Sequence, residues 1–293
     1  LSQVSRVLLV AIGKASLPMA QAAAELLGSD LSDGIVIAKE APAADSQREL
    51  ARCRVIRGGH PFPDQQSLQA GRAVMDLLRD TSPDDLVLFL ISGGGSALLS
   101  MPAAGISLEE FKQVNEVLLA CGANIGEINT IRKHISQVKG GQLAGAAAPA
   151  EQISLVLSDV VGDPLDMIAS GPTVPDTTTF DEALQVIETY HLERDVPSSV
   201  LAHLKNGTLG RLPDTPKPGD QGFERSTTLV IGNNLLAARA GIEQAQKAGF
   251  HALHLTSRYQ GEARTIGSFM AGVLQQMADT GDPLPRPACL IAG

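Results

Sequence analysis

The chain lacks the cysteine pattern of a disulfide-bonded or zinc-binding fold. Its three cysteines, Cys53, Cys121 and Cys289, are odd in number and far apart, and none lies at Cys-x-x-Cys or Cys/His ligand spacing. Neither a disulfide framework nor a structural zinc site is therefore supported. Free thiols of this kind are typical of a reducing compartment, so we expect a cytoplasmic protein.

Long apolar runs and blocks of like charge are also missing. No run approaches the ~20 residues needed to span a bilayer, and the N-terminus shows no charged segment followed by a cleavable apolar stretch. The 293 residues include 23 Lys and Arg against 32 Asp and Glu, a formal net charge of −9. A nucleic acid or a membrane surface would repel such a chain. We therefore expect a small-molecule ligand, with no nucleic acid and no membrane partner.

Short runs of leucine and β-branched residues alternate with segments of helical periodicity. Arg6–Ala11, Leu86–Ile91 and Gln152–Leu157 are predicted as strands, and the first two are apolar enough for burial on both faces. Gln65–Asp80 and Ile125–Val138 are predicted as helices. This alternation predicts an α/β fold, a Rossmann-like parallel sheet covered by helices.

A change in composition marks the expected domain boundary. Pro213–Gly222 (PDTPKPGDQG) has the composition of a surface linker. We expect an N-terminal α/β domain over residues 1–222 and the start of a second, incomplete α/β domain over residues 223–293. The chain begins without Met and Ala288–Gly293 ends in what resembles a buried strand, so we expect a fragment trimmed at both ends.

The first segment with a chemical signal follows the strand Arg6–Ala11. Gly13 allows close approach of the backbone to a ligand, and Lys14 then precedes a helix whose N-terminus attracts anions. A lysine at this place supplies a charge suited to a phosphate or carboxylate. A plain strand-to-helix turn with a solvated lysine explains the segment equally well. It is not a Walker A loop, because only one glycine precedes the lysine.

A glycine-rich turn follows the strand Leu86–Ile91. Exposed N–H groups in such a turn can hold phosphate oxygens, and ligands of open α/β sheets gather outside the carboxyl ends of the strands. A flexible surface turn is the alternative. The spacing does not match G-x-G-x-x-G, so a standard dinucleotide site is not indicated. We predict an anion site formed by Ser92, Gly93, Gly94, Gly95 and Ser96.

A basic segment lies on the helix predicted over Ile125–Val138. Arg132 and Lys133, together with Lys139, are candidates for a cationic wall, with Asn129 as a neutral partner. A solvated basic helix face is the plainer interpretation, and both stay open.

Two further turns carry polar side chains after strands. Asp159 follows Gln152–Leu157, and carboxylates near phosphates hold Mg²⁺ or accept a proton from the attacking hydroxyl. The alternative is an Asx-turn, which we expect for Asp176. Asn233 is a candidate ligand contact, and a simple helix N-cap by Asn234 is the alternative.

Taken together, these segments resemble the class II glycerate 2-kinases, whose C-terminal region is known as the MOFRL domain. The similarity runs through most of the chain in the family's order. It covers the motifs GKA at Gly13–Ala15, GGHPFPD at Gly58–Asp64, SGGGSALL at Ser92–Leu99, NTIRKHISQVKGG at Asn129–Gly141, LSDVVGDPLDMIASGPTVPD at Leu157–Asp176 and IGNN at Ile231–Asn234.

The resemblance implies a two-domain α/β protein with its active site in the interdomain cleft. It implies a kinase reaction in which ATP and D-glycerate give 2-phosphoglycerate and ADP with Mg²⁺. It also implies that Lys14 contacts phosphate, that the glycine-rich turn and Asp159 line one cleft, and that a homodimer is reasonable. The family continues beyond a strand like Leu290–Gly293 into a glycine-rich segment and an Arg-Asn-Gln-Glu motif, and these are absent here.

The resulting hypothesis makes Lys14 and Asp159 catalytic, with Asp159 also the metal ligand. Two rivals remain open. Members of this family have carried the label hydroxypyruvate reductase, which would need an NAD(P)H fingerprint that the sequence lacks. A non-catalytic module that binds a sugar acid or a nucleotide is the other. The expected substrate- and phosphate-binding residues are the five of the glycine-rich turn with Asn129, Arg132, Lys133 and Asn233.

Overall fold

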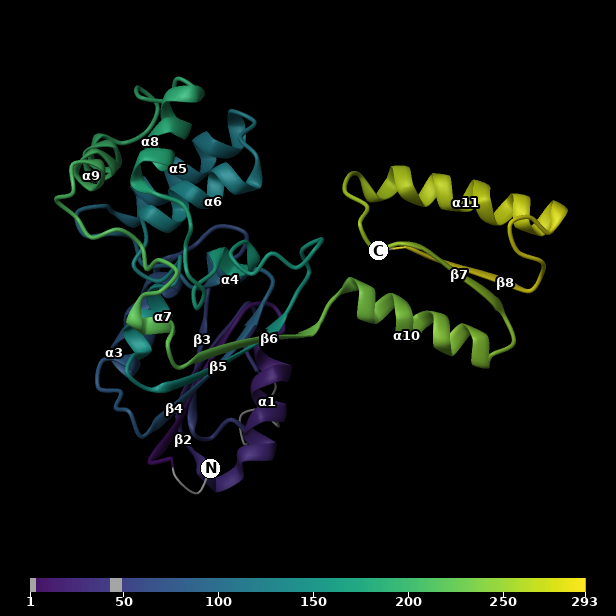
Figure 1. The fold of residues 1–293 in the computed structure, drawn as a ribbon, viewed down its shortest axis with the longest axis horizontal. Coiled ribbons are helices and arrows are strands. Elements are labelled where there is room, and N and C mark those ends of the chain that lie inside the picture. The colour runs from purple at the N-terminus through teal and green to yellow at the C-terminus, as the bar shows by residue number, and fades with distance from the viewer. Residues whose placement is uncertain (1–3, 43–48, 293) are drawn as a thin grey trace. The chain divides into compact units, whose positions relative to one another are not determined.

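The structure is a computed structural model that describes residues 4–42 and 49–292. The chain divides into two compact units (Figure 1). The first unit comprises the chain up to Leu157 together with Leu165–Leu229, and the second comprises Ser158–Pro164 together with the chain from Val230 onwards.

A six-stranded sheet forms the centre of the first unit, in the order β3-β2-β1-β4-β5-β6. Its strands are β1 (Arg6–Ile12), β2 (Leu31–Ala38), β3 (Cys53–Arg57), β4 (Asp85–Ser92), β5 (Glu151–Leu157) and β6 (Ser226–Gly232). The pairs among the first five strands are all parallel. The predicted Rossmann-like α/β fold is therefore confirmed.

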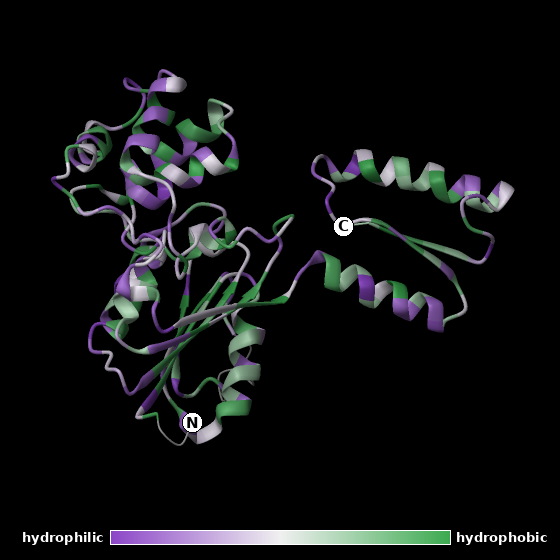
Figure 2. Ribbon diagram, in the orientation of Figure 1, coloured by the Kyte–Doolittle hydropathy of each residue, from purple (hydrophilic) through white to green (hydrophobic). Residues whose placement is uncertain are grey.

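Burial explains why the two central strands have apolar sequences. Every residue of β1 after Arg6 is buried, and β4 is buried along nearly its whole length. Helices cover both faces of this sheet, with α1 (Ser16–Leu27) on one side and α3 (Gln65–Leu78) with α7 (Gln142–Ala147) on the other (Figure 1). The apolar strands stand out against the mixed colouring of the helices in Figure 2.

Four helices at one end of the sheet have a core of their own. They are α5 (Leu108–Ala120), α6 (Ile125–His134), α8 (Phe180–Thr189) and α9 (Ser198–Thr208). Phe111, Ile131 and Phe180 are among the side chains buried between them. Side-chain capping boxes begin α5 at Ser107, α6 at Asn124 and α8 at Thr179.

The helix predicted over Ile125–Val138 is shorter than expected and ends at His134. Beyond it, the backbone pairs with another segment instead of continuing the helix. The N–H of Ala103 donates to Ile135 O at 2.9 Å, and the N–H of Gln137 donates to Met101 O at 2.8 Å. These long-range hydrogen bonds override the local helical pattern, which is why periodicity alone placed the end wrongly.

The second unit contains one parallel β-α-β arrangement with a preceding helix. Its elements are α10 (Asn234–Lys247), β7 (His251–Thr256), α11 (Ala263–Thr280) and β8 (Ala288–Ala292). β7 and β8 are parallel neighbours.

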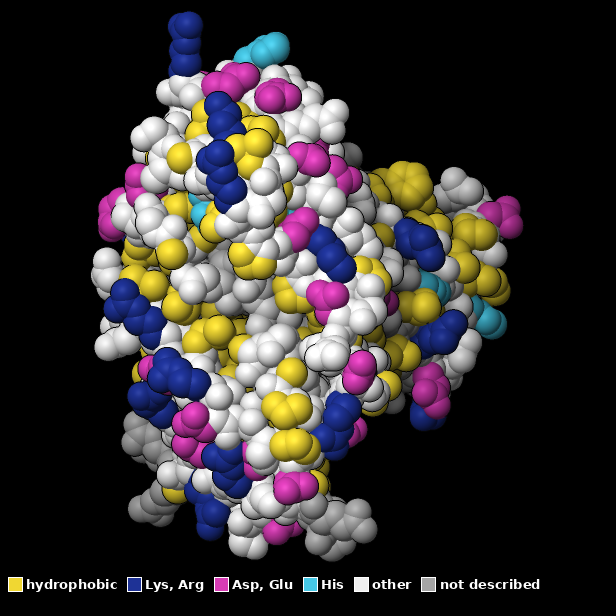
Figure 3. All heavy atoms as spheres, turned by 60° about the vertical axis from the view of Figure 1, so that its left-hand side comes forward, with side chains coloured by type: hydrophobic (Ala, Val, Ile, Leu, Met, Phe, Trp, Pro, Cys, Tyr) yellow, Lys and Arg dark blue, Asp and Glu magenta, His cyan; other side chains and the backbone are white. Residues whose placement is uncertain are grey.

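The surface of the molecule carries both signs of charge. In the view of Figure 3, Lys and Arg side chains are dispersed among Asp and Glu, with no continuous basic area on this face. No helix among the described residues is both long and apolar enough to span a membrane.

Candidate functional site

The order of the sheet locates one place where loops diverge. β1 lies between β2 and β4. From β1 the chain continues to β2, toward one edge of the sheet, and from β4 it continues to β5, toward the opposite edge. Ligands of open parallel sheets bind outside the carboxyl ends of the strands at such a switch point. The two turns predicted to hold anions, after β1 and after β4, lie at this point.

Direct hydrogen bonds lock these two turns together. The N–H of Lys14 donates to Gly93 O at 2.9 Å. The Ser92 hydroxyl donates to Ile12 O at 3.2 Å and accepts from the N–H of Ala15 at 3.0 Å. Gly13 makes this approach possible, because a side-chain carbon there would lie 2.3 Å from Ser92 Oγ. Ser92 is thus a buried scaffold residue between the turns.

The glycine-rich turn presents backbone donors. Gly94 has a left-handed backbone, with φ at 83°, and α4 (Gly95–Leu98) follows it. Within the described part of the chain, the N–H groups of Gly94, Gly95 and Ser96 donate to no backbone carbonyl outside α4. The exposed Lys14 side chain runs beside this turn, because a side-chain carbon on Gly94 would lie 3.2 Å from Lys14 Cε.

The loop after β3 brings a histidine to the same place. A side-chain carbon on Gly94 would lie 3.2 Å from His60 Nε2. The loop is held by Gly58, where a side-chain carbon would lie 2.5 Å from Leu98 O. It is also held by the N–H of Gly59, which donates to Ser67 Oγ at 2.9 Å. Asp64 then caps α3.

A pocket opens beside the turn, with a cavity volume of about 240 Å³. It is lined by His60, Pro61, Phe62, Pro63, Gly94, Ser96, Ala97, Phe111, Asn115, Leu119, Arg132 and Lys139. No carboxylate is among these residues, whereas three lining side chains, those of His60, Arg132 and Lys139, are basic. The pocket therefore favours a small anion with an apolar portion.

Asn115 orients the guanidinium of Arg132. The Asn115 amide donates to Phe111 O at 2.6 Å and accepts a hydrogen bond from Arg132 Nε. The two terminal amino groups of Arg132 have no hydrogen-bond partner among the described residues, so they are available to a carboxylate. Burial lowers the pKa of Arg132, yet a guanidinium stays charged at any physiological pH.

Lys139 donates hydrogen bonds to the backbone of the short helix α4 and of the residue that follows it. Its ammonium donates to Ser96 O at 2.7 Å and to Leu99 O at 3.0 Å. Complete burial, with a smaller effect of nearby Arg132, lowers the pKa of Lys139 to about 7. The lysine fixes the end of the glycine-rich turn and borders the pocket.

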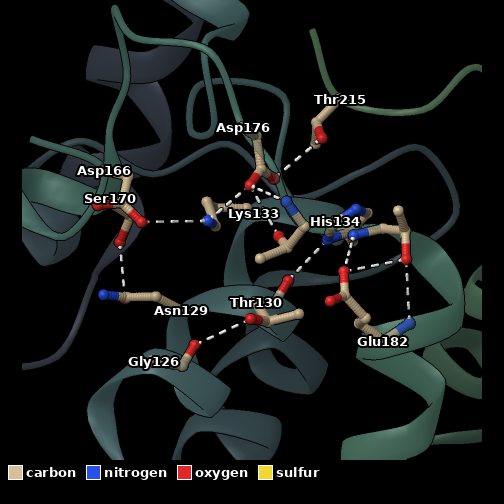
Figure 4. A network of polar contacts seen from close by, with 12 residues as sticks. Gly126, Asn129, Thr130, Lys133, His134, Asp166, Ser170, Asp176, Glu182 and Thr215 are labelled. Atoms are coloured by element: carbon tan, nitrogen blue, oxygen red, sulfur yellow. Dashed lines mark hydrogen bonds and ion pairs between the residues drawn. The ribbon is translucent and has the colours of Figure 1, made fainter. Parts of the chain in front are cut away.

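Asn129 acts on the turn through a serine. Ser170 donates to Asn129 Oδ1 at 3.0 Å (Figure 4) and shares a 2.8 Å hydrogen bond with Ser96. Ala169 and Ser170 have φ of 53° and 61°, a left-handed conformation that costs non-glycine residues free energy. Asn129 is buried and is linked to the turn through this relay.

Lys133 lies apart from the pocket, in a buried ion pair. Its ammonium is 2.6 Å from Asp176 Oδ1, and both side chains are almost fully buried (Figure 4). Asp176 also accepts from Thr215 Oγ1 at 2.9 Å and from the N–H of Thr178 at 2.9 Å. The Asx-turn expected for Asp176 is present, but it is one part of a larger buried network.

The remaining predicted residues belong to the second unit. Asp159 is exposed and has no hydrogen bond within the described residues. Asn233 caps α10 by accepting from the N–H of Leu236 at 2.8 Å, and its amide donates to Asp163 Oδ2 at 2.6 Å. The N-cap alternative was therefore right in kind but wrong by one residue, since Asn233 caps the helix and Asn234 does not.

The sequence analysis assigned no role to two polar residues of the pocket, His60 and Asn115. His60 was visible only as part of the motif GGHPFPD, and its single imidazole in a proline-rich loop gave no local chemical signal. Asn115 lies inside a regular amphipathic helix. A contact between α5 and α6, which no sequence spacing encodes, gives this asparagine its role.

The fold and this site define an α/β protein whose sheet switch point carries a cationic pocket. The family profile described as "Domain of unknown function (DUF4147)" matches residues 1–205, and the chain belongs to this family. The predicted resemblance to glycerate kinases is confirmed at the level of the family, because curated glycerate 2-kinases are similar to almost the whole chain.

Three relatives illustrate the similarity. The "Glycerate 2-kinase" of Pyrococcus horikoshii is 40% identical over 98% of this chain and 63% of its own length. A "Putative hydroxypyruvate reductase" of Agrobacterium vitis is 40% identical over 98% of this chain and 63% of its own length. The crystal structure of a glycerate kinase from Thermotoga maritima has a TM-score of 0.84 and 40% identity, covering 100% of this chain and 67% of that one. The chain thus spans less than two thirds of the length of the two curated relatives.

Proposed function

We propose that this protein is a glycerate 2-kinase, which transfers a phosphoryl group from ATP to D-glycerate and gives 2-phosphoglycerate and ADP. The observation that supports this assignment is a small pocket at the sheet's switch point, whose described lining residues include basic side chains and no carboxylate. Relatives named glycerate kinases support this assignment. A three-carbon acid fits a cavity of about 240 Å³.

The residues take distinct roles in this proposal. Arg132, oriented by Asn115, receives the glycerate carboxylate through its two free amino groups. The N–H groups of Gly94, Gly95 and Ser96 hold oxygens of the transferred group, and Lys14 neutralises charge that develops on it. Positioning and charge neutralisation supply most of the rate enhancement in phosphoryl transfer.

Four of the predicted binding residues have structural roles in this proposal and do not contact the ligand. They are Ser92, Gly93, Asn129 and Lys133. Ser92 and Gly93 fix the two turns to each other, and Asn129 holds Ser96 through Ser170. Lys133 was predicted as a substrate ligand, and a direct contact would require opening its buried ion pair with Asp176. We therefore assign the carboxylate contact to Arg132 and a structural role to Lys133.

Mg²⁺ is part of the proposed reaction. No group of three or more His, Cys, Asp or Glu side chains suited to a metal ion occurs among residues 4–42 and 49–292. We therefore propose that substrate phosphates supply most of the Mg²⁺ ligands. Proteins usually hold Mg²⁺ through one or two carboxylates together with substrate oxygens. Asp159, exposed and without a partner, is the proposed carboxylate, and it also orients the glycerate hydroxyl. When bound, Mg²⁺ would neutralise phosphate charge.

Several wider features belong to the same proposal. We propose a glycerate-kinase domain over residues 1–222 and the start of a MOFRL-type domain over residues 223–293, with Asn233 as a proposed ligand contact of the second domain. The two compact units divide slightly later in the chain, within β6 (Ser226–Gly232). The three cysteines are free, which fits a protein of the reducing cytoplasm. A homodimer is proposed from the family resemblance, and light scattering on the purified protein tests it.

The deciding experiment measures ADP release by the purified protein with ATP, Mg²⁺ and D-glycerate, and identifies the product by ³¹P NMR. We expect 2-phosphoglycerate. Lys14→Ala should lower turnover on the order of a hundredfold, the usual cost of removing one group that stabilises transition-state charge. Near-normal turnover of this variant would remove Lys14 from the mechanism.

A parallel assay follows NADH absorbance with hydroxypyruvate and no ATP. Its motivation is the relative named as a putative hydroxypyruvate reductase. The glycine-rich turn lacks the spacing of a dinucleotide fingerprint, so we expect no oxidation of NADH. Oxidation without ATP would replace the kinase assignment, and ligand binding without ADP release would favour a non-catalytic binding module.

A further inference from the structure

Four successive strands of the first unit each deliver one group to the same edge of the sheet. Lys14 follows β1, Lys39 follows β2, His60 follows β3 and Gly94 lies just after β4. His60 and Lys14 both lie beside Gly94, because a side-chain carbon on that glycine would be 3.2 Å from His60 Nε2 and 3.2 Å from Lys14 Cε. The lysines are exposed and the histidine is half-buried.

The imidazole of His60 has no hydrogen-bond partner among the described residues, although it lines the pocket. Burial lowers the pKa of His60, and the charges of Lys14 and Lys39 lower it further. The other basic groups that line the pocket are Arg132 and Lys139. The nearest carboxylate along the loop, Asp64, is engaged as the cap of α3. Among the described residues, the charges that act on His60 are those of Lys14 and Lys39.

We propose that His60 is a phosphate-contacting residue that takes up a proton from solvent when a phosphoryl or similar tetrahedral dianion binds beside Gly94. This inference rests on the proposed kinase function and assigns an orientation to the ligand in the pocket. The carboxylate of the acid lies at Arg132, and the phosphoryl group lies between Lys14, Lys39 and His60. The ligand class is therefore a short phosphorylated hydroxy acid.

The physical reason is the change in charge around the imidazole. In the free protein, burial and then the two ammonium groups lower the pKa of His60 and so disfavour the imidazolium. A bound dianion reverses the local field, and an opposite charge within about 4–6 Å favours the charged form. His60 then donates a charge-assisted hydrogen bond to the anion. Binding of the phosphorylated ligand is coupled to proton uptake, whereas binding of D-glycerate at Arg132 is not.

Sulfate is the sharpest probe, because it is a tetrahedral dianion that does not itself titrate between pH 5.5 and 8.5. NMR of the histidine side chains, with sulfate or with chloride at equal ionic strength, gives the midpoint of each titration. We expect sulfate to raise the His60 midpoint by about one pH unit, and 2-phosphoglycerate to act likewise. His60→Gln keeps a neutral donor and assigns the signal. The control His191→Asn removes an exposed histidine at a left-handed position, φ 55°, that asparagine tolerates.

Binding by calorimetry at pH 6 supplies the second measurement. His60→Gln should weaken sulfate binding about tenfold, the loss of one charge-assisted hydrogen bond, and should weaken D-glycerate binding less. A His60 midpoint that sulfate leaves unchanged, or equal losses for both ligands, would overturn the inference. Neither readout needs turnover, so a protein without kinase activity but with this titration would contradict the proposed function alone.

Discussion

Arg132 and Lys133 are adjacent in the sequence, carry the same charge and have different surroundings in the structure. One helical position rotates a side chain by about 100°, so Arg132 reaches the pocket while Lys133 points into a buried network. The basic segment predicted as a cationic wall is thus divided between a ligand contact and an internal ion pair.

Replacing Arg132 should affect substrate binding more than turnover. Arg132→Lys keeps the charge but loses the fork that binds a carboxylate with two hydrogen bonds. We expect KM for D-glycerate to rise about tenfold or more, with a smaller loss in kcat. Steady-state kinetics checks this, with Arg194→Lys as a control because Arg194 is exposed. An unchanged KM would place the carboxylate elsewhere.

Replacing one partner of the buried pair should destabilise the fold. Lys133→Met leaves the Asp176 carboxylate buried and unpaired, which typically costs about 3–5 kcal/mol. Urea denaturation measures the loss. The double variant Lys133→Met/Asp176→Leu should recover much of it, since it removes the stranded charge. A double variant less stable than the single one would contradict this account.

The same pair predicts how stability responds to acid. Burial by itself would raise the pKa of Asp176, but the hydrogen bonds from Lys133 and Thr178 outweigh burial and lower it. A carboxyl with a lowered pKa in the folded state stabilises the fold above its ordinary range, and the contribution disappears as the pH falls through the folded value. The free energy of unfolding should therefore decrease below about pH 4, and Asp176→Asn should show a smaller decrease.

At the scale of elements, the central contact is the approach of β1 and β4 at their carboxyl ends. Gly13→Ala would place a carbon 2.3 Å from Ser92 Oγ and 2.4 Å from Ser92 O, at a φ of 117°. We expect a loss of stability on the order of 3–5 kcal/mol, because both backbone strain and a backbone clash are involved. Thermal or urea unfolding tests this.

Gly122→Ala is the matched control for Gly13→Ala. Its φ is 83°, and nothing lies within 4 Å of the added carbon. The control should lose only about 1 kcal/mol, the cost of a non-glycine residue in the left-handed region. Equal losses for the two variants would mean that backbone strain alone, and not the approach of the strands, limits Gly13.

At the scale of the whole molecule, the two units differ in how much apolar surface they bury. Among the described residues of the second unit, the buried hydrophobic side chains are Ala238, Met277 and Leu290. Phe250, Phe269 and Leu274 of that unit are exposed. The first unit contains nearly all of the buried core, including two extended clusters. Burial of apolar surface is the main stabilising contribution.

The second unit should therefore open more readily than the first. In hydrogen exchange followed by mass spectrometry, amides of β7 and β8 should exchange well before those of β1 and β4, because local opening requires less apolar exposure. Proline-rich and loop peptides serve as the fast reference. Equal protection of the two sets of strands would show that the small core of the second unit does not limit its stability.

The sequence by itself determined the parts that depend on local chemistry. The alternation of apolar runs and helical periods specified a parallel sheet with helices. The turns after β1 and β4 were visible because glycines, a lysine and hydroxyls follow buried strands. These features are local, and residues a few positions apart are enough to encode them.

Only the tertiary structure decided which of the polar side chains meet. Strand order brought Lys14, His60 and the glycine-rich turn to one edge of the sheet. The packing of α5 against α6 allows Asn115 to accept a hydrogen bond from Arg132. The contact of residues 135–137 with residues 101–103 ended α6 early. All of these depend on pairs of residues distant along the chain, whose meeting is set by the packing of the whole core and not by the spacing of any motif.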